Sequence, residues 1–496
     1  MTEDTRALEA VKFPRYERRG IFMGLKWYQL VLLTLGILTA IIASATGGPV
    51  GLTTMSPIWL LLMLMGVLQH ARIPYPIWIS LITLFFVRLI LGQTRYLARP
   101  EKALKAGKLA LPGGLGSLKL QRTRRGECFI VDPQGKEATV VLRCTTRSFA
   151  LLDDDDKAWA AQAWSRVQAG LAQRSDIARI AVQDYTVPYP SSALQVFYDH
   201  TIVKSGGRPG GNSWGELAYQ DLIAAAGSAM SHDVLLSVVV DTAKSRRRIK
   251  ESGGGTAGLE RVLRLEVQAI TTSLATHGVR VDEWLSESRL LEVFRGSFDP
   301  ETVSRGSTKN DGDPESDQPA VKRRLSSSPM AVEEHWTYLR TDSGFHQTFW
   351  VAEWPRQKVY PGFLHPLVYI GDFRHTVTQV IRAVPTLEAL RDIRSAQEAH
   401  ETRRRINARF DRPTTREQRA EEEEVSQREE EIVAGHGDVR PTAFVTITAA
   451  SLEDLARHRH ELESAAAGAF VELRLLAGQQ WAAFIAGGLP LGRGLR

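Results

Sequence analysis

Charged residues are unevenly distributed along the chain, and their distribution separates a membrane segment from a water-soluble region. Asp, Glu, Lys and Arg are absent from residues 27–71 and again from residues 73–87. Within the first run, residues 28–45 form an apolar stretch of about the length needed to cross a hydrocarbon core of roughly 30 Å. A second apolar stretch covers residues 50–69, after the turn sequence Thr-Gly-Gly-Pro at 46–49. The pattern predicts a hairpin of two transmembrane helices.

Basic residues on both sides of this hairpin predict its orientation. Lys and Arg precede the first apolar stretch and follow the second, whereas the turn between them is uncharged. Because basic segments favour the cytosolic side, we expect both ends of the hairpin in the cytosol, with residues 1–26 as a cytosolic arm. A cleaved signal peptide is disfavoured because a second apolar run follows directly. The predicted location is the cell membrane, with a multi-pass topology.

A third apolar run, residues 77–93, has a different character. It contains Arg88 and follows the sequence Pro74-Tyr75-Pro76. A charge inside a membrane span is costly, and a third crossing would place the following basic stretch and the C-terminal domain outside the cell. The pattern therefore favours an interfacial or re-entrant helix and assigns residues 27–107 to the membrane hairpin plus this helix. Three crossings remain the alternative.

From about residue 108 the pattern changes to short strands and amphipathic helices. Strands are predicted at residues 128–131, 139–142, 177–183, 234–240, 443–448 and 470–475. Helices are predicted at residues 153–174, 213–230 and 259–276, and another follows Ser451, which has Asp454 at capping-box spacing. This alternation predicts an α+β fold, a mixed sheet with helices on one face, carrying helical insertions.

Two insertions divide this cytosolic region. Residues 108–298 form its first part, and residues 299–332, rich in Asp, Ser, Pro and Gly, are predicted to be a flexible insertion. Residues 333–496 form its second part, which includes a charged helical insertion at 386–433 interrupted at Pro413. The Arg run at 403–405 and the Glu run at 421–424 are expected to face each other across a helical hairpin.

The sequence contains no pattern typical of a catalytic, metal or cofactor site. It has no GxxxxGK[ST], HExxH or GxSxG string, and its two cysteines lie in no zinc-binding pattern. The glycine-rich residues 253–258 lack the Lys of a phosphate loop, and His335, His346 and His365 are not at ligand spacing. We therefore expect a non-enzymatic protein without cofactor, with these histidines in structural roles.

Basic clusters provide the main alternative function. They lie at residues 246–250, 322–324 and 403–405 in a chain with a pI near 9.2. Such clusters are compatible with contact to nucleic acid, but these have acidic neighbours and little aromatic interleaving, and anionic membrane lipid is an equally suitable partner. A membrane-anchored nucleic-acid-binding protein is the second hypothesis.

Several short motifs, taken in order along the chain, carry a family resemblance. They are Phe-Pro-Arg-Tyr-Glu at 13–17, Pro-Ile-Trp at 76–78, Phe-Ile-Val-Asp-Pro-Gln-Gly at 129–135, Phe-Ala-Leu-Leu-Asp at 149–153, Gly-Gln-Gln-Trp at 478–481 and Leu-Pro-Leu-Gly at 489–492. With these motifs the chain resembles the PrgI-like membrane proteins of Gram-positive conjugation systems, which are type IV-like secretion machines. Its soluble part resembles the N-terminal, non-motor domain of the conjugation ATPase.

The resemblance implies a structural scaffold at the base of a secretion channel. Its expected partners are a separate conjugation ATPase, other channel subunits, membrane lipid and further copies of itself. The terminal apolar segment suggests a docking surface for the ATPase, with these candidate residues: Trp481, Phe484, Leu489, Pro490, Leu491 and Gly492. The alternative is that these side chains are buried in their own domain.

The topology can be tested with single cysteines. A cysteine replacing Thr46, in the uncharged turn, should react with an impermeant thiol reagent in intact cells, because the turn is expected outside the cytosol. A cysteine replacing Ser117 should stay unlabelled until the membrane is opened. Labelling at Ser117 in intact cells would favour three crossings over two.

Overall fold

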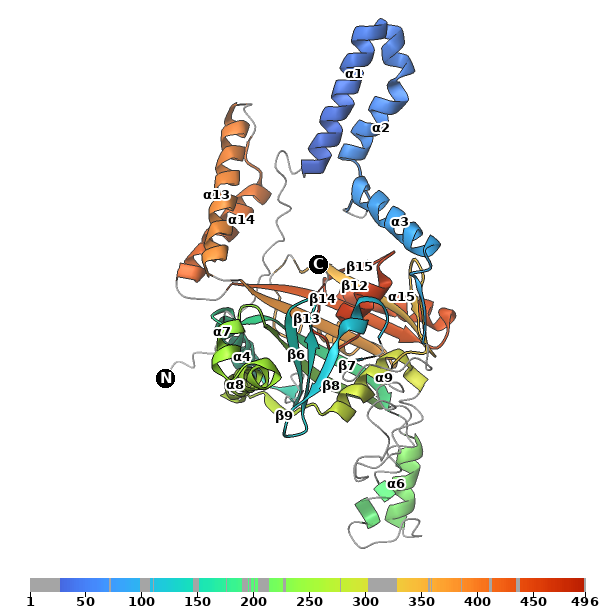
Figure 1. The fold of residues 1–496 in the computed structure, drawn as a ribbon, viewed down its shortest axis with the longest axis vertical. Helices are drawn as coiled ribbons and strands as arrows, with labels where there is room; N and C mark the ends of the chain where they lie inside the picture. Colours follow the sequence, from blue (N-terminus) through green and yellow to red (C-terminus); the bar gives the residue numbers. More distant parts are fainter. Residues whose placement is uncertain are drawn as a thin grey trace. The chain divides into compact units, whose positions relative to one another are not determined.

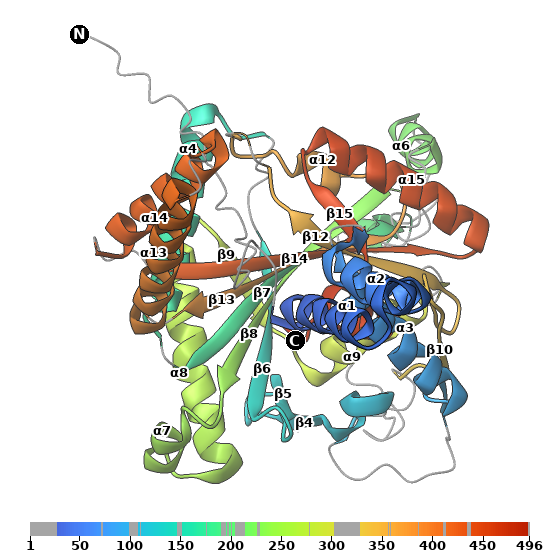
Figure 2. The ribbon, with the colours of Figure 1, turned by 90° about the horizontal axis from the view of Figure 1, so that it is seen from above.

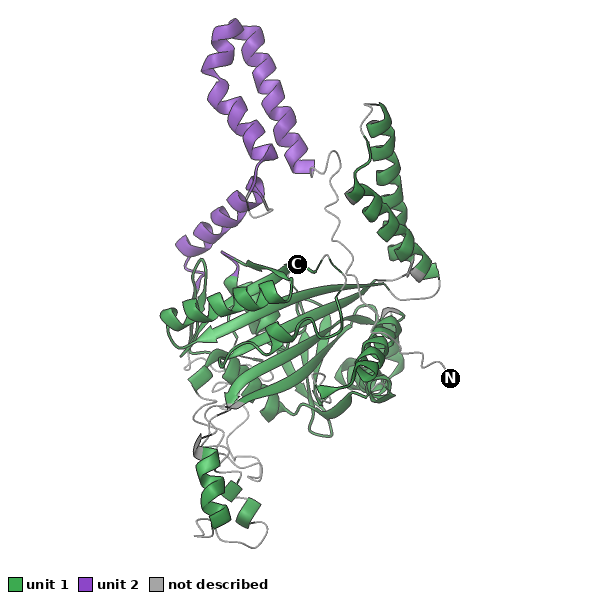
Figure 3. Cartoon of the chain, turned by 180° about the vertical axis from the view of Figure 1, so that it is seen from behind, with its two compact units in different colours: residues 1–14, 95–476, 480–496 green, residues 15–94, 477–479 purple. Residues whose placement is uncertain are grey.

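The computed structural model describes residues 27–70, 73–98, 108–109, 111–145, 151–174, 176–189, 195, 198–199, 201–203, 214–225, 229–276, 278–301, 328–355, 357, 359–384, 386–409, 413–433 and 438–494. It contains two compact units, residues 15–94 with 477–479 (the membrane unit) and residues 1–14, 95–476 and 480–496 (the sheet unit), coloured in Figure 3. The predicted arm 1–26, most of the predicted insertion 299–332 and the basic run 322–324 lie outside the described residues.

The membrane unit consists mainly of three helices, α1 (Trp27–Thr54), α2 (Ser56–Val67) and α3 (Tyr75–Ile90), with the short antiparallel pair β1 (Gln69–His70) and β2 (Ile73–Pro74) before α3. Gly48 interrupts α1 with a φ of 56°, which agrees with the predicted turn at 46–49. The predicted second span is split, because the chain breaks again at Met55. Among the described helices, α1 alone is both long and apolar enough to cross a membrane; α2 and α3 are shorter apolar helices.

Two glycines let α1 and α2 pack closely. A Cβ atom on Gly36 would lie 2.9 Å from Met63 Cγ, and one on Gly66 would lie 3.1 Å from the carbonyl oxygen of Gln29. The buried Gln29 side chain donates a hydrogen bond of 2.9 Å to the Gly66 carbonyl. Small residues and interhelical hydrogen bonds are the contacts that join helices in lipid, where apolar side chains gain little by leaving the bilayer. The contacts between α1 and α2 thus suit a membrane hairpin.

Thirteen strands of the described chain form the single large sheet of the sheet unit (Figure 1). They are β3 (Arg95–Leu97), β4 (Lys119–Arg122), β5 (Cys128–Asp132), β6 (Glu137–Thr145), β7 (Ile177–Tyr189), β8 (Ala229–Asp241), β9 (Arg280–Trp284), β10 (Ala331–Glu334), β11 (Leu339–Arg340), β12 (Phe345–Glu353), β13 (His375–Val384), β14 (Asp438–Ala449) and β15 (Glu472–Leu475). The order is β3-β10-β11-β12-β14-β13-β7-β8-β6-β5-β4, and β15 and β9 pair with β12 and β6.

The second half of this sheet repeats the topology of the first. In the first half, β7 pairs with β8, β8 with β6, and β5 and β9 both pair with β6. In the second half, β13, β14, β12, β11 and β15 make the same pairs in the same chain order. The halves join where β7 and β13 run antiparallel, with Asp184 opposite Val377. The sheet is therefore two copies of one arrangement related by an approximate two-fold axis.

Helices cover both faces of the sheet. Successive side chains of a strand point to opposite faces, so neighbouring strand residues pack against different helices. On one face Val140, Leu142 and Val238 pack against α4 (Asp154–Ala172) and α8 (Gly255–Thr276), and the second half packs against α12 (His365–Val368) and α15 (Leu452–Gly468). On the other face Val141 and Leu235 pack against η1 (Gly113–Ser117), α9 (Glu287–Phe298) and α16 (Gln480–Gly487). The predicted α+β class is confirmed, whereas the prediction that helices cover one face is wrong, because apolar strand residues point to both faces and helices pack on each.

Local predictions agree with the structure to different degrees. The predicted hairpin is present as β5 and β6, with Phe129 opposite Val140, and Ser451 caps α15 by accepting a hydrogen bond from the Asp454 amide at 3.1 Å. The predicted helix 213–230 is wrong at its end. Helix α6 (Trp214–Ala225) stops earlier, and Met230 lies in β8, because strand pairing with β7 extends to Ala229.

The charged insertion forms the antiparallel hairpin of α13 (Thr386–Arg409) and α14 (Arg416–Val433). At its outer part Arg403 and Arg404 lie 3.5 and 3.3 Å from the carboxylates of Glu421 and Glu422, which confirms the predicted charge pairing. At its base the small apolar cluster includes Val384, Ala389, Ile393 and Ile432. The hairpin is thus held by apolar packing next to the sheet and by ion pairs farther out.

His346 on β12 is a fully buried histidine with a structural role. Its Nε2 lies 2.7 Å from Thr341 Oγ1 and its Nδ1 lies 2.9 Å from Thr448 Oγ1. Burial lowers the pKa of His346 to about 3, and the nearby Arg374 charge acts in the same direction. The imidazole is therefore neutral in the folded protein over the physiological range of pH.

Acid is expected to destabilise the sheet unit through this residue. The unfolded imidazole binds a proton near pH 6.5, whereas the folded one does not until about pH 3, so stability falls as the pH drops below about 6.5. The variant His346→Gln lacks this proton uptake. Its urea midpoint should depend less steeply on pH between about 6.5 and 4 than that of the native chain, although His375 and His458, whose pKa values burial also lowers, still contribute. Equal slopes would refute this assignment.

Candidate functional site

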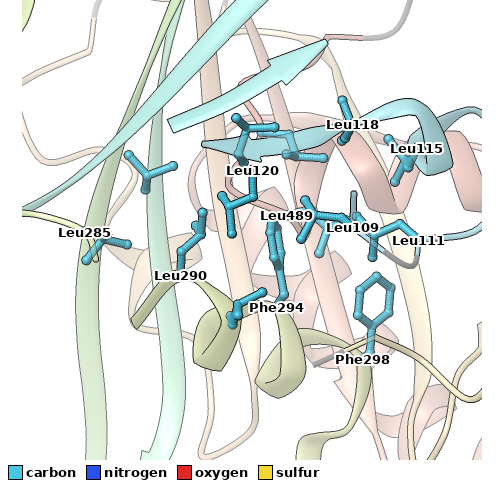
Figure 4. Close-up of a cluster of buried hydrophobic side chains, with 14 of the residues drawn as sticks. Leu109, Leu111, Leu115, Leu118, Leu120, Leu285, Leu290, Phe294, Phe298 and Leu489 are labelled. Carbon is cyan, nitrogen blue, oxygen red and sulfur yellow. The ribbon is translucent and has the colours of Figure 1, made fainter. Parts of the chain in front are cut away.

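The predicted docking residues lie in the last described segment, and the structure buries most of them inside the sheet unit. Phe484, Leu489 and Leu491 belong to the apolar cluster beneath α9 and are at most 2% exposed. Figure 4 shows Leu489 among Leu290, Phe294 and leucines from the η1 region. Pro490 and Gly492 are buried as well, and Trp481 is half-buried beside Phe298. Most of these side chains are therefore buried in their own domain, which was the alternative to an exposed docking surface.

After α16 the chain crosses the sheet as an irregular segment, residues 487–494, called the C-terminal belt. A buried segment outside a ladder must find other partners for its carbonyl groups. The Gly487 carbonyl accepts hydrogen bonds from Gln183 Nε2 on β7 at 3.2 Å and from Thr378 Oγ1 on β13 at 2.8 Å. These two strands belong to different halves of the sheet, so the belt begins at their junction.

The belt continues over the first half of the sheet. The Pro490 carbonyl accepts a hydrogen bond from Ser237 Oγ on β8 at 3.0 Å, and the Leu491 carbonyl accepts one from Thr139 Oγ1 on β6 at 3.4 Å. The Gly492 carbonyl accepts one from Arg179 Nε. Polar side chains at buried strand positions thus replace the missing ladder partners.

Two glycines allow the belt to approach the sheet. A Cβ atom on Gly487 would lie 2.8 Å from Thr446 Oγ1 and 2.9 Å from Phe444 Cβ. Gly492 has a φ of 60°, a conformation that side chains disfavour, and its Cβ atom would lie 2.7 Å from Val239 Cγ2. The Gly of the Leu-Pro-Leu-Gly motif therefore has a packing role.

Ion pairs fix the far end of the belt. Arg179 pairs with Glu137 on β6 at 2.6 Å, and Arg493 pairs with Asp132 at the end of β5. Sequence reasoning missed the belt, although a signal was present. Thr139, Gln183 and Ser237 are polar residues inside apolar strands, where an unpaired polar group is costly. Their positions indicate a buried irregular segment above the sheet.

The described surface offers two other projecting elements. The α13–α14 hairpin is inserted between β13 and β14, and α6 lies between β7 and β8, which is the equivalent position in the first half. Because β7 and β13 are antiparallel, the two insertions leave opposite ends of the sheet (Figures 1 and 2). The apolar residues Trp214, Leu217 and Leu222 of α6 are exposed.

The remaining candidate groups have structural surroundings. Among the described residues no cluster of three metal-binding side chains is present. Burial raises the pKa of the Cys144 thiol to about 12, which leaves it unreactive at neutral pH. His458 is largely buried and stacks on Phe373, with ring centroids 4.0 Å apart. The aromatic residue Phe349 on β12 is a core residue.

The chain combines an α+β fold with an N-terminal helix that is long and apolar enough to cross a membrane. Residues 228–351, about a quarter of the chain, match a family model named EccE and described as "Putative type VII ESX secretion system translocon". The match begins directly before β8 and ends within β12. No curated protein matches the chain. The chain is a secretion-system membrane protein, and the match gives no support to the PrgI-like, type IV assignment.

Removing belt side chains should destabilise the sheet unit. Leu489→Ala is expected to lower the free energy of unfolding by about 2–5 kcal/mol, because Leu489 is buried and its deletion leaves a cavity. Leu452→Ala, at a leucine that is 46% exposed, is the control and should cost less than about 1 kcal/mol. Urea titration of the purified chain measures both. Similar effects of the two substitutions would show that the belt is not part of the core.

Proposed function

We propose that this chain is a non-enzymatic structural component of a type VII-like secretion translocon. Two membrane crossings would hold the sheet unit on the cytosolic side, where it joins neighbouring subunits. The family match supports the type VII machine over the conjugation machine that the short motifs resemble. The family match and the short motifs both point to a membrane-bound secretion component. They differ in the secretion machine to which it belongs.

The duplicated sheet is the observation that best supports a connecting role for this chain. Its two insertions leave the sheet at opposite ends, and each follows the same strand of its repeat. A rigid sheet with one projection at each end is suited to joining two neighbours at a fixed distance. Contacts of this kind need no catalytic centre, and the two elements best placed to make them are α6 and the α13–α14 hairpin.

The α13–α14 hairpin is the better defined of the two. Arg440 on β14 pairs with Asp392 on α13, and Arg428 on α14 lies 2.6 Å from the Asp438 carboxylate. Arg382 on β13 lies 3.6 Å from Glu388. These pairs fix the base of the hairpin to its own strands, so its outer part has a defined direction from the sheet. We propose that this outer part contacts another translocon subunit, and a separately encoded ATPase is one such partner.

Shortening the hairpin tests this role. Replacing residues 397–427 with a short Gly-Ser linker removes the outer ion pairs and the partly buried Val425, but keeps the four buried residues of the apolar base and the Arg428 pair. We expect the melting temperature to change by only a few degrees, because exposed ion pairs contribute little. Other translocon subunits should no longer co-purify with the chain from detergent extracts.

A charge-exchanged variant is the matched control. Exchanging Arg403 and Arg404 with Glu421 and Glu422 keeps the pairing across the hairpin while reversing which helix carries each charge. It should keep the hairpin folded, so loss of partners in this variant would indicate recognition of the charges themselves. Full co-purification with the shortened chain would contradict the connecting role of the hairpin. ATP hydrolysis by the purified chain would contradict the non-enzymatic assignment.

A further inference from the structure

One surface of the sheet unit gathers six basic side chains, five of which have no acidic partner among the described residues. This surface, called the α7 patch, surrounds α7 (Arg246–Glu251) and the start of α8, which lie side by side in Figure 2. Its members are exposed Lys and Arg residues: Lys136, Lys244, Arg246, Arg247, Lys250 and Arg261. They come from the β5–β6 turn, the turn after β8, α7 and α8.

Hydrogen bonds between these segments make the patch continuous. The Thr242 amide donates to the Lys136 carbonyl at 2.9 Å, which joins the β5–β6 turn to the turn that contains Lys244. Arg261 Nη1 donates to the Ser252 carbonyl at 2.5 Å, which joins α8 to the end of α7. The fold therefore holds Lys136 and Arg261 on the same surface as the four members of the patch between residues 244 and 250.

Most of these charges are not neutralised by the protein. Arg247 pairs with Glu251 at 2.8 Å, whereas no carboxylate of the described residues lies within ion-pair distance of the other five. The neighbouring carboxylates already form ion pairs or hydrogen bonds with other groups. Glu266 pairs with both Arg248 and Arg174 at 2.8 Å, and the Asp241 carboxylate accepts the amides of Ala243 and Lys244. The patch therefore keeps a strong positive charge.

The turn between α7 and α8 adds to this charge. Gly253, Gly254 and Gly255 all have positive φ values, and α8, which is 22 residues long, starts there. The first amides of a helix have no carbonyl partner within it, and the helix dipole is positive at this end. Backbone and side chains thus favour the same kind of ligand, one with phosphate groups.

We propose that the α7 patch binds the anionic headgroups of membrane lipid and docks the sheet unit onto a bilayer. The apolar helix α1 supports lipid over nucleic acid, because a membrane anchor in the same chain keeps lipid phosphates at high local concentration. The patch contains no aromatic residue on which bases could stack. Each unpaired Lys or Arg side chain near an anionic surface increases binding about fivefold, so the five unpaired side chains of the patch together give a docking that is strong but reversible by salt.

The experiment uses the full chain reconstituted in vesicles of phosphatidylcholine alone or with about a third phosphatidylglycerol. A donor dye on a cysteine replacing the exposed Gln268 of α8 reports energy transfer to an acceptor on the lipid headgroups; the native Cys128 and Cys144 are buried. We expect higher transfer in the anionic vesicles, lost at high salt because screening weakens exposed charges. The triple variant Lys244→Glu, Arg246→Glu, Lys250→Glu should show the same low transfer in both vesicles.

A second triple variant controls for overall charge. Arg391→Glu, Arg394→Glu and Arg409→Glu change the net charge equally, at exposed positions on α13, and should leave the transfer in anionic vesicles unchanged. Fluorescent duplex DNA is then added to the chain in phosphatidylcholine vesicles. DNA binding that needs Lys244, Arg246 and Lys250, without a response to phosphatidylglycerol, would overturn the proposal and assign the patch to nucleic acid. A lipid response that survives in the first variant, or is lost in the second, would also overturn it.

Discussion

The sheet unit depends on satisfying the backbone carbonyls of the C-terminal belt. An irregular segment buried over a sheet has no ladder partners, and an unpaired carbonyl there would cost free energy comparable to a lost hydrogen bond. Gln183, Ser237 and Thr378 supply the missing donors from three strands. Because Gln183 and Thr378 share the Gly487 carbonyl, the belt also joins the two halves of the sheet at their junction.

The two-fold arrangement gives the domain its directionality. Each repeat has a projection after its equivalent strand, and the antiparallel contact of β7 with β13 turns the two projections away from each other. The projections have different chemistry, since the α13–α14 hairpin is rich in ion pairs whereas α6 exposes Trp214 and Leu222. A duplicated framework has thus acquired two distinct ends, as a connector between unlike neighbours requires.

The sequence allowed local features to be predicted better than distant ones. The hairpin at Phe129 and Val140, the Ser451 cap and the facing Arg and Glu runs each depend on residues near one another in the chain, where turn residues and helix periodicity are informative. The end of α6 was wrong because pairing of β8 with β7, a long-range contact, decides it. The repeat of the sheet was not predicted, because it is a pattern of pairing between strands that are distant in the chain.

The predicted docking residues illustrate the same limit. An apolar run such as Leu489 to Leu491 looks alike whether it covers its own sheet or a partner, and only the polar donors on β6, β7 and β8 distinguish the two cases. Those donors are more than 200 residues away. The α7 patch likewise brings together Lys136 and Arg246, which no single sequence window contains.

The position of the belt also has a consequence for the order of events during synthesis. The belt is the last described part of the chain to leave the ribosome, yet it covers apolar residues of strands made several hundred residues earlier, including Val239. By that time the helices α1 and α2 have already emerged and can be in the bilayer. The face of the first half of the sheet that the belt covers therefore stays incomplete until the second half has been translated. During that interval the exposed face is the part of the nascent chain most in need of a chaperone.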